Sequence, residues 1–84
     1  MYEVVFSNKA ERQLKKFEKE MQGRIVSCLE RARIRPGAHF KKLVGEDAYS
    51  LRVGHYRIIA DIEREKLLIL VLKIGPRKKI YKML

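Results

Sequence analysis

The apolar segment from Leu67 to Ile74 constrains the fold of this chain more than any other feature of its sequence. It reads LLILVLKI, is apolar except for Lys73, and is followed directly by Gly75 and Pro76. A strand that is apolar on both faces must be covered on both faces and flanked by other strands. We therefore expect an inner strand, which the rest of the chain has to pair with and cover.

Three further segments show the alternation of apolar and polar residues that is typical of strands. They are residues 2–6, 49–53 and 56–62, and the last two are separated only by Gly54 and His55. A glycine at the first position of a two-residue connection favours a type II′ turn between antiparallel strands. The segments 49–53 and 56–62 are therefore predicted to form a hairpin.

Between the first strand and residue 38, apolar residues recur at helical spacing, which predicts two helices joined as a hairpin. Ser7 or Asn8 can cap the first helix. Gly23 allows a turn into the second helix, and Pro36 with Gly37 ends it. The apolar positions of the two helices are Ala10, Leu14, Phe17 and Met21, then Ile25 or Val26, Leu29 and Ala32.

Residues 38–48 lack a clear period, and we expect an ordered loop there, pinned by Phe40 and Leu43, with no regular element. The element order is then β-α-α-β-β-β. It predicts an α+β fold, in which a helical hairpin packs on one face of a four-stranded, mainly antiparallel sheet and a short C-terminal tail follows. With no linker or internal repeat, residues 1–84 are expected to form a single domain.

The chain is strongly basic, with 20 Lys and Arg, 10 Asp and Glu and a net charge of +10. Such a charge on a short chain repels itself unless an anionic partner offsets it, which favours nucleic acid. Binding to a membrane surface would require a helix with a broad apolar face, and neither predicted helix has one. A charge-rich surface without a partner is a further alternative, although such surfaces usually balance the two signs.

The cysteine count and the start of the chain bear on location and cofactors. Cys28 is the only cysteine, so there is no intramolecular disulfide and no thiol cluster to hold a metal. The chain enters a strand pattern at once, without a signal peptide, and it has no apolar segment of about 20 residues. We therefore expect a cytoplasmic protein that uses no metal or other cofactor and does not enter a membrane.

The register of the predicted hairpin places Val53 opposite Tyr56 on the core face and Arg52 opposite Arg57 on the other face. Like charges directly opposite each other cost stability. The pair therefore favours an anion site, because the planar arginine fork matches phosphate. Two arginines that diverge into water are the alternative.

The C-terminal tail adds further candidates for binding. Arg77 follows the inner strand and can approach the arginine pair. Tyr81, an aromatic residue among basic ones, suits stacking on a base, or else packs the tail onto the sheet.

His39 and His55 lie in a loop and a turn, where we expect structural roles. The lysines expected to contact RNA are Lys41, Lys42, Lys78, Lys79 and Lys82.

Four stretches of the sequence coincide with the motifs of one family. They are Ser7 with Lys9–Glu11, the segment Lys42–Gly45, the hairpin Tyr49–Arg57 and the closing Ile74–Tyr81. Together they resemble a RelE-type toxin of the RelE/ParE superfamily. The resemblance spans the whole chain, and the last two motifs are its most specific part.

The resemblance implies the toxin of a type II toxin–antitoxin pair, which cuts messenger RNA in the ribosomal decoding site without a metal. A ribose 2′-hydroxyl attacks the adjacent phosphodiester and leaves a cyclic phosphate. The working residues of the family, carried over by motif, fall on Arg52, Arg57, Arg77 and Tyr81. Arg57 and Arg77 would stabilise the charge that develops at phosphorus. Tyr81 would stack on or orient the base, and could exchange a proton.

The chain departs from this family at three positions. Ser50 and Arg52 stand where better-studied relatives have lysines, and Pro76 stands where related motifs often have histidine. Because arginine hardly releases its proton, the group that transfers a proton is left open. A ParE-like inhibitor of DNA gyrase and a non-catalytic RNA-binding module are the alternative functions, since the fold does not choose among them.

The expected protein partner is an acidic antitoxin that folds on binding. The two helices can cover only one face of the strand 67–74. The apolar surface left on the other face, which we expect to be rimmed by Lys and Arg, suits a segment with apolar side chains and carboxylates.

Overall fold

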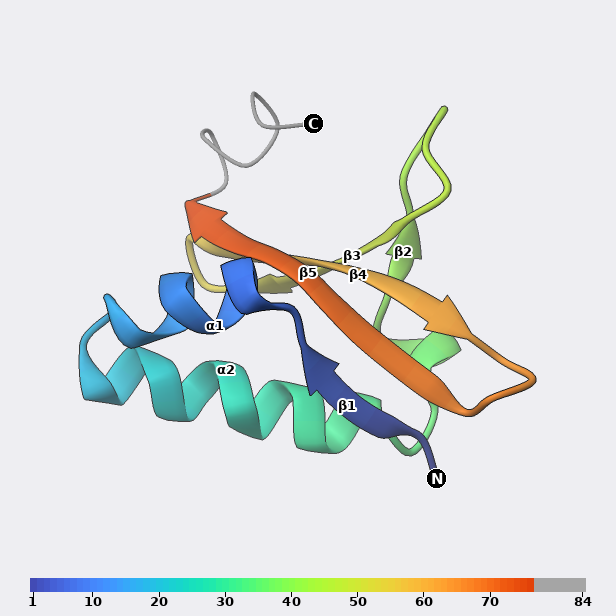
Figure 1. Ribbon diagram of the computed structural model, residues 1–84, viewed down its shortest axis with the longest axis horizontal. Coiled ribbons are helices and arrows are strands. Elements are labelled where there is room, and N and C mark those ends of the chain that lie inside the picture. The colour runs from blue at the N-terminus through green and yellow to red at the C-terminus, as the bar shows by residue number, and fades with distance from the viewer. Residues whose placement is uncertain (77–84) are drawn as a thin grey trace.

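Two helices pack against one face of a five-stranded sheet in the computed structural model (Figure 1). The structure describes residues 1–76. Its elements are β1 (Glu3–Phe6), α1 (Asn8–Lys15), α2 (Lys19–Ala32), the 3-10 helix η1 (Pro36–Ala38), β2 (Lys41–Lys42), β3 (Tyr49–Val53), β4 (Tyr56–Glu63) and β5 (Leu68–Pro76). The predicted α+β class, with a helical hairpin on one face of the sheet, is confirmed. In this described part, no helix is long and apolar enough to span a membrane.

β5 is an inner strand, as its apolar sequence predicts. The strand order is β1-β5-β4-β3-β2. β1 runs parallel to β5, while β4 runs antiparallel to both β5 and β3. The first and last strands of the described chain are therefore neighbours, with both helices and the hairpin between them in sequence (Figure 1).

The prediction that residues 38–48 form no regular element was wrong. β2 adds a fifth strand by pairing Lys41 with Ser50 and Lys42 with Tyr49. Two residues are too few to show a period, so the pattern could not reveal this strand. Its consequence for the surface is that Lys41 lies beside Ser50 at the edge of the sheet.

The predicted boundary between the helices was also wrong. α1 ends at Lys15 and α2 already begins at Lys19, so Gly23 lies inside α2. Backbone bonds from Lys16 N to Gln13 O and from Phe17 N to Leu14 O close α1, and Gln22 Nε2 donates to Phe17 O at 2.8 Å. The apolar stripe runs on across this break because both helices pack on the same sheet, so periodicity alone does not mark it.

The core lies between the helices and the sheet. α2 contributes Ile25 and Leu29, and the sheet contributes Ile58, Ile69 and Val71, all with at most 2% of their surface exposed. At the end of the helix layer where α1 gives way to α2, the ring of Phe17 lies 4.8 Å from that of Tyr56. This contact packs the junction of the two helices against the first residue of β4.

β5 contains a bulge that changes which side chains reach each face. Ile59 pairs with Lys73 and Ala60 pairs with Val71, so Leu72 is the extra residue. Ile69 and Val71 face the helices before the bulge, and Ile74 does so after it. Lys73 is therefore turned to the face of the sheet that the helices leave open, which we call the open face.

Side chains from the start of the helix layer satisfy the backbone around this bulge. The hydroxyl of Ser7 donates to Leu72 O at 2.9 Å, and Ile74 N donates to Gln13 Oε1 at 2.7 Å. Ser7 is also the N-cap of α1, since its oxygen accepts from Ala10 N at 3.1 Å. One serine thus ties the first turn of α1 to the irregular part of β5.

We predict that Ser7→Ala lowers the free energy of unfolding by about 2 kcal/mol, because it removes the cap and leaves a part-buried carbonyl without its donor. Urea denaturation followed by circular dichroism measures the loss. Asn8→Ala is the matched control, because the structure assigns the cap to Ser7 rather than Asn8. Equal losses in the two variants would contradict this role for Ser7.

Candidate functional site

The hairpin of β3 and β4 has the geometry expected from its sequence. Gly54 has a positive φ of 59°, while His55 is not among the described non-glycine residues with positive φ, so the turn is of type II′. Val53 pairs with Tyr56, and Arg52 pairs with Arg57. The prediction that two arginines face each other across the hairpin, on its open face, is confirmed.

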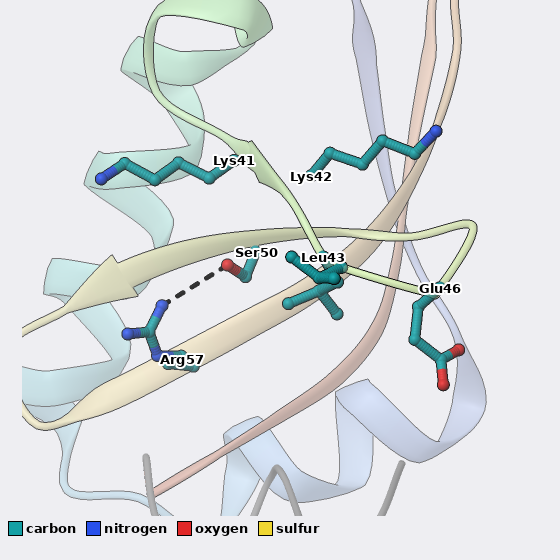
Figure 2. A pocket seen from close by; sticks show the side chains of 7 residues that line it. Lys41, Lys42, Leu43, Glu46, Ser50 and Arg57 are labelled. Carbon is teal, nitrogen blue, oxygen red and sulfur yellow. Dashed lines mark hydrogen bonds between the residues drawn. The ribbon is translucent and has the colours of Figure 1, made fainter.

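The two arginines are held by different partners. Arg57 is half-buried, and its Nη1 donates to Ser50 Oγ at 3.4 Å (Figure 2). Ser50 itself is only 4% exposed. Arg52 is exposed, and its Nε donates to Gly54 O at 3.3 Å. Arg57 is thus fixed against the sheet, whereas Arg52 lies along the turn.

Two adjoining hollows, of about 440 and 360 Å³, share Lys41, Ser50 and Arg57 in their walls. One of them is also lined by Lys42, Leu43, Val44 and Glu46, and the other by His39, Leu51 and Arg52. Lys41 and Lys42 leave β2 in opposite directions, as neighbours in a strand do, and the Lys41 side chain extends on the side of the Arg57 guanidinium (Figure 2). The hollows thus gather cations from β2, β3 and β4.

His39 is one functional candidate for which the sequence favoured a structural role. It follows η1 directly, its side chain is exposed, and it lines the same hollow as Arg52 and Arg57. A side chain in this place can reach a ligand bound in the hollow, which a purely structural role does not require. His55 lies exposed in the turn, as expected.

Lys73 is the other residue that the sequence did not reveal. Strict alternation along β5 would turn it toward the helices with Ile69 and Val71, and only the bulge at Leu72 turns it to the open face. There it pairs with Ile59, two residues along β4 from Arg57. Side chains at such diagonal positions are within reach of each other.

The open face is divided by charge. Arg52, Arg57 and Lys73 lie toward the hairpin turn, while Asp61 and Glu63 lie toward the other end of β4, across from Leu70 and Leu68. The expectation of an apolar surface rimmed by Lys and Arg therefore holds at one end only. Two ion pairs of the described residues, Lys15 with Glu11 and Arg33 with Glu30, lie in and just after the helices.

Several predicted site residues lie outside the described residues: Arg77, Lys78, Lys79, Tyr81 and Lys82. The described chain ends at Pro76, which pairs with Tyr56 and follows Gly75, the partner of Arg57. Among residues 1–76 no group of three or more His, Cys, Asp or Glu side chains is placed to hold a metal ion.

Solved structures of similar fold come from several organisms. The RelBE2 toxin–antitoxin complex of Mycobacterium tuberculosis aligns with a TM-score of 0.83 at 26% identity, over 90% of this chain and 98% of that one. The RelB–RelE complex of Methanococcus jannaschii aligns at 0.74 and 25%, over 95% and 98%. The intact RelBE complex of E. coli aligns at 0.78 and 22%, over 90% and 96%, and at this identity shows the fold alone.

The sequence matches the model of a known family, although it matches no curated protein. The family model described as the ParE toxin of the type II toxin–antitoxin system parDE matches residues 4–81, which is almost the whole chain. The chain therefore belongs to the ParE toxin family of type II toxin–antitoxin systems and is a RelE-type toxin of the RelE/ParE superfamily.

Proposed function

We propose that this toxin is a metal-independent endoribonuclease that cuts messenger RNA in the decoding site of the ribosome and so inhibits translation in the cytoplasm. The observation that carries the proposal is the fixed position of Arg57. Its guanidinium is held by Ser50 in the wall of hollows that Lys41, Arg52 and His39 also line. A preorganised guanidinium in a basic hollow suits the negative charge that develops on a phosphodiester under attack.

In the proposed reaction the ribose 2′-oxygen forms a bond to phosphorus, and the bond from phosphorus to the 5′-oxygen of the next nucleotide breaks. The 2′-hydroxyl gives up a proton and the leaving oxygen takes one, so the products are a 2′,3′-cyclic phosphate and a 5′-hydroxyl. Arg57 and Arg77 stabilise the phosphoryl oxygens, and Tyr81 stacks on or orients the base. His39 exchanges the proton that Ser50 and Arg52 cannot.

A ParE-like inhibition of DNA gyrase is the second candidate, because the family model that matches this sequence is named for ParE. The arginine pair of the hairpin favours RNA cleavage over this candidate. A gyrase poison acts by binding a protein and does not require a preorganised phosphate site.

We propose an antitoxin as the protein partner of this chain, since the similar structures include RelB–RelE complexes. Leu68, Leu70 and Leu72 are half-buried on the open face or at the bulge, and Val5, opposite Leu70, is 37% exposed. A segment that folds over these residues would place its carboxylates toward Lys73 and the arginine pair. Near Asp61 and Glu63 we expect it to carry a cation or a polar residue.

We predict that expression of this chain without its antitoxin stops protein synthesis before DNA synthesis. Pulse labelling with an amino acid and with thymidine measures the two rates, and primer extension on programmed ribosomes locates the cut in the messenger. If DNA synthesis stops first, with gyrase trapped on cleaved DNA, the gyrase candidate is correct and the nuclease proposal is wrong.

We predict that Arg77→Ala and Arg57→Ala each slow cleavage by about 100-fold or more, while ribosome binding largely survives, because a transition-state donor acts mainly on rate. Single-turnover cleavage and ribosome pelleting measure the two quantities. Arg64→Ala, in the exposed turn between β4 and β5, is the charge-matched control. Equal loss of cleavage and binding would make these arginines docking residues.

We also predict that Lys73→Met weakens single-stranded RNA binding and reduces the slope of log K against log salt concentration by about 0.7, the value for one lost phosphate contact. Fluorescence anisotropy over a salt series measures it. Lys66→Met removes the same charge from the exposed β4–β5 turn and leaves the slope unchanged. Identical slopes for both variants would show that Lys73 acts only through net charge.

A further inference from the structure

Gly54, the first residue of the hairpin turn, lies near arginines from two layers of the fold. Arg52 of β3 donates from its Nε to Gly54 O at 3.3 Å. The guanidinium of Arg24 of α2 lies on the side of Gly54 where a side chain would be, since a Cβ built at Gly54 would be 3.5 Å from Arg24 Nη2 and 3.6 Å from Nη1. The exposed turn thus lies near two guanidinium groups, one from β3 and one from α2, whose positive charges attract anions.

A groove of about 480 Å³ on the flank of α2 continues from Arg24. Arg24, Ser27 and Arg31 lie along it, one or two helical turns apart, and Glu20 is the carboxylate in its wall. With a rise of about 1.5 Å per residue, Arg24 and Arg31 are about 10 Å apart along the helix. That length matches about three nucleotides of a stacked strand at about 3.4 Å each.

We propose that the RNA strand bound beside Arg57 continues over the Gly54 turn and along this groove of α2, with its phosphates held by Arg24 and Arg31. The inference rests on the proposed function, because it extends the path of the same strand. The groove walls include no aromatic side chain among the residues that line it. Contacts there are therefore to the backbone and are independent of base sequence.

The unique cysteine provides a direct test, since Cys28 lines the groove and is partly exposed. A single-stranded RNA of about 4 nucleotides can fill only a short binding site, whereas one of about 12 nucleotides can fill a long one. The 12-mer, at ten times its Kd, is expected to slow alkylation of Cys28 by iodoacetamide about tenfold. The 4-mer, which fills only the hollows at Arg57, is expected to leave the alkylation rate unchanged.

Arg24→Gln with Arg31→Gln is the test variant, and Lys9→Gln with Arg12→Gln, both exposed on α1, is the charge-matched control. The test variant is expected to lose protection by the 12-mer and to reduce its salt slope by about 1.4, for two phosphate contacts. The control is expected to keep the protection. Thermal melting checks that both variants fold.

The outcomes separate this inference from the proposed function. If anisotropy shows that the 12-mer binds but the 12-mer does not protect Cys28, the RNA does not run along α2. That result overturns this inference and leaves the proposed function standing. This inference is also overturned if the 4-mer protects Cys28, or if the control variant loses as much protection as the test variant. If neither RNA binds the unchanged chain at low salt, the proposed RNA site at Arg57 and its extension along α2 are both wrong.

Discussion

The bulge in β5 is the constraint on which the rest of the structure depends. An inner strand of apolar residues would, with strict alternation, turn Lys73 into the core against the helices. The extra residue Leu72 prevents this by reversing the alternation, so that Ile74 packs on the helices and Lys73 does not. The cost of an irregular strand is lowered by Ser7 and Gln13, which bond to backbone groups beside the bulge. The start of α1 and the last described strand are therefore fixed together.

One consequence is the division of the open face by charge. The bulge adds Lys73 to the arginine pair at the hairpin end, while the regular part of β5 keeps Leu68 and Leu70 opposite Glu63 and Asp61. The same strand thus serves two surfaces, a basic one suited to phosphates and an apolar one with carboxylates at its margin. A partner that covers both has to match this order of charges, which gives specificity beyond apolar burial alone.

The sequence predicted those parts of the fold that local chemistry decides. The turn at Gly54 requires positive φ and sets the register of Arg52 against Arg57, so the pairing of the two arginines follows from the sequence alone. The break between the helices, the two-residue β2 and the orientation of Lys73 depend instead on contacts between distant segments, such as Gln13 with Ile74. His39 joins the site for the same reason, because η1 and β2 carry it to the hairpin.

Ser50 stands where the family resemblance implies a lysine, so the proposed roles of the site residues differ from those of the family. Ser50 is buried beside Arg57, where a lysine would set two cations together at a poorly solvated place. The serine oxygen instead accepts a hydrogen bond from the guanidinium and fixes its position. In the proposed function the hairpin thereby has a well-placed phosphate donor and lacks a group that could transfer a proton. In the proposed reaction proton transfer falls to His39, which follows η1 and lies in the wall of the same hollow as Ser50 and Arg57.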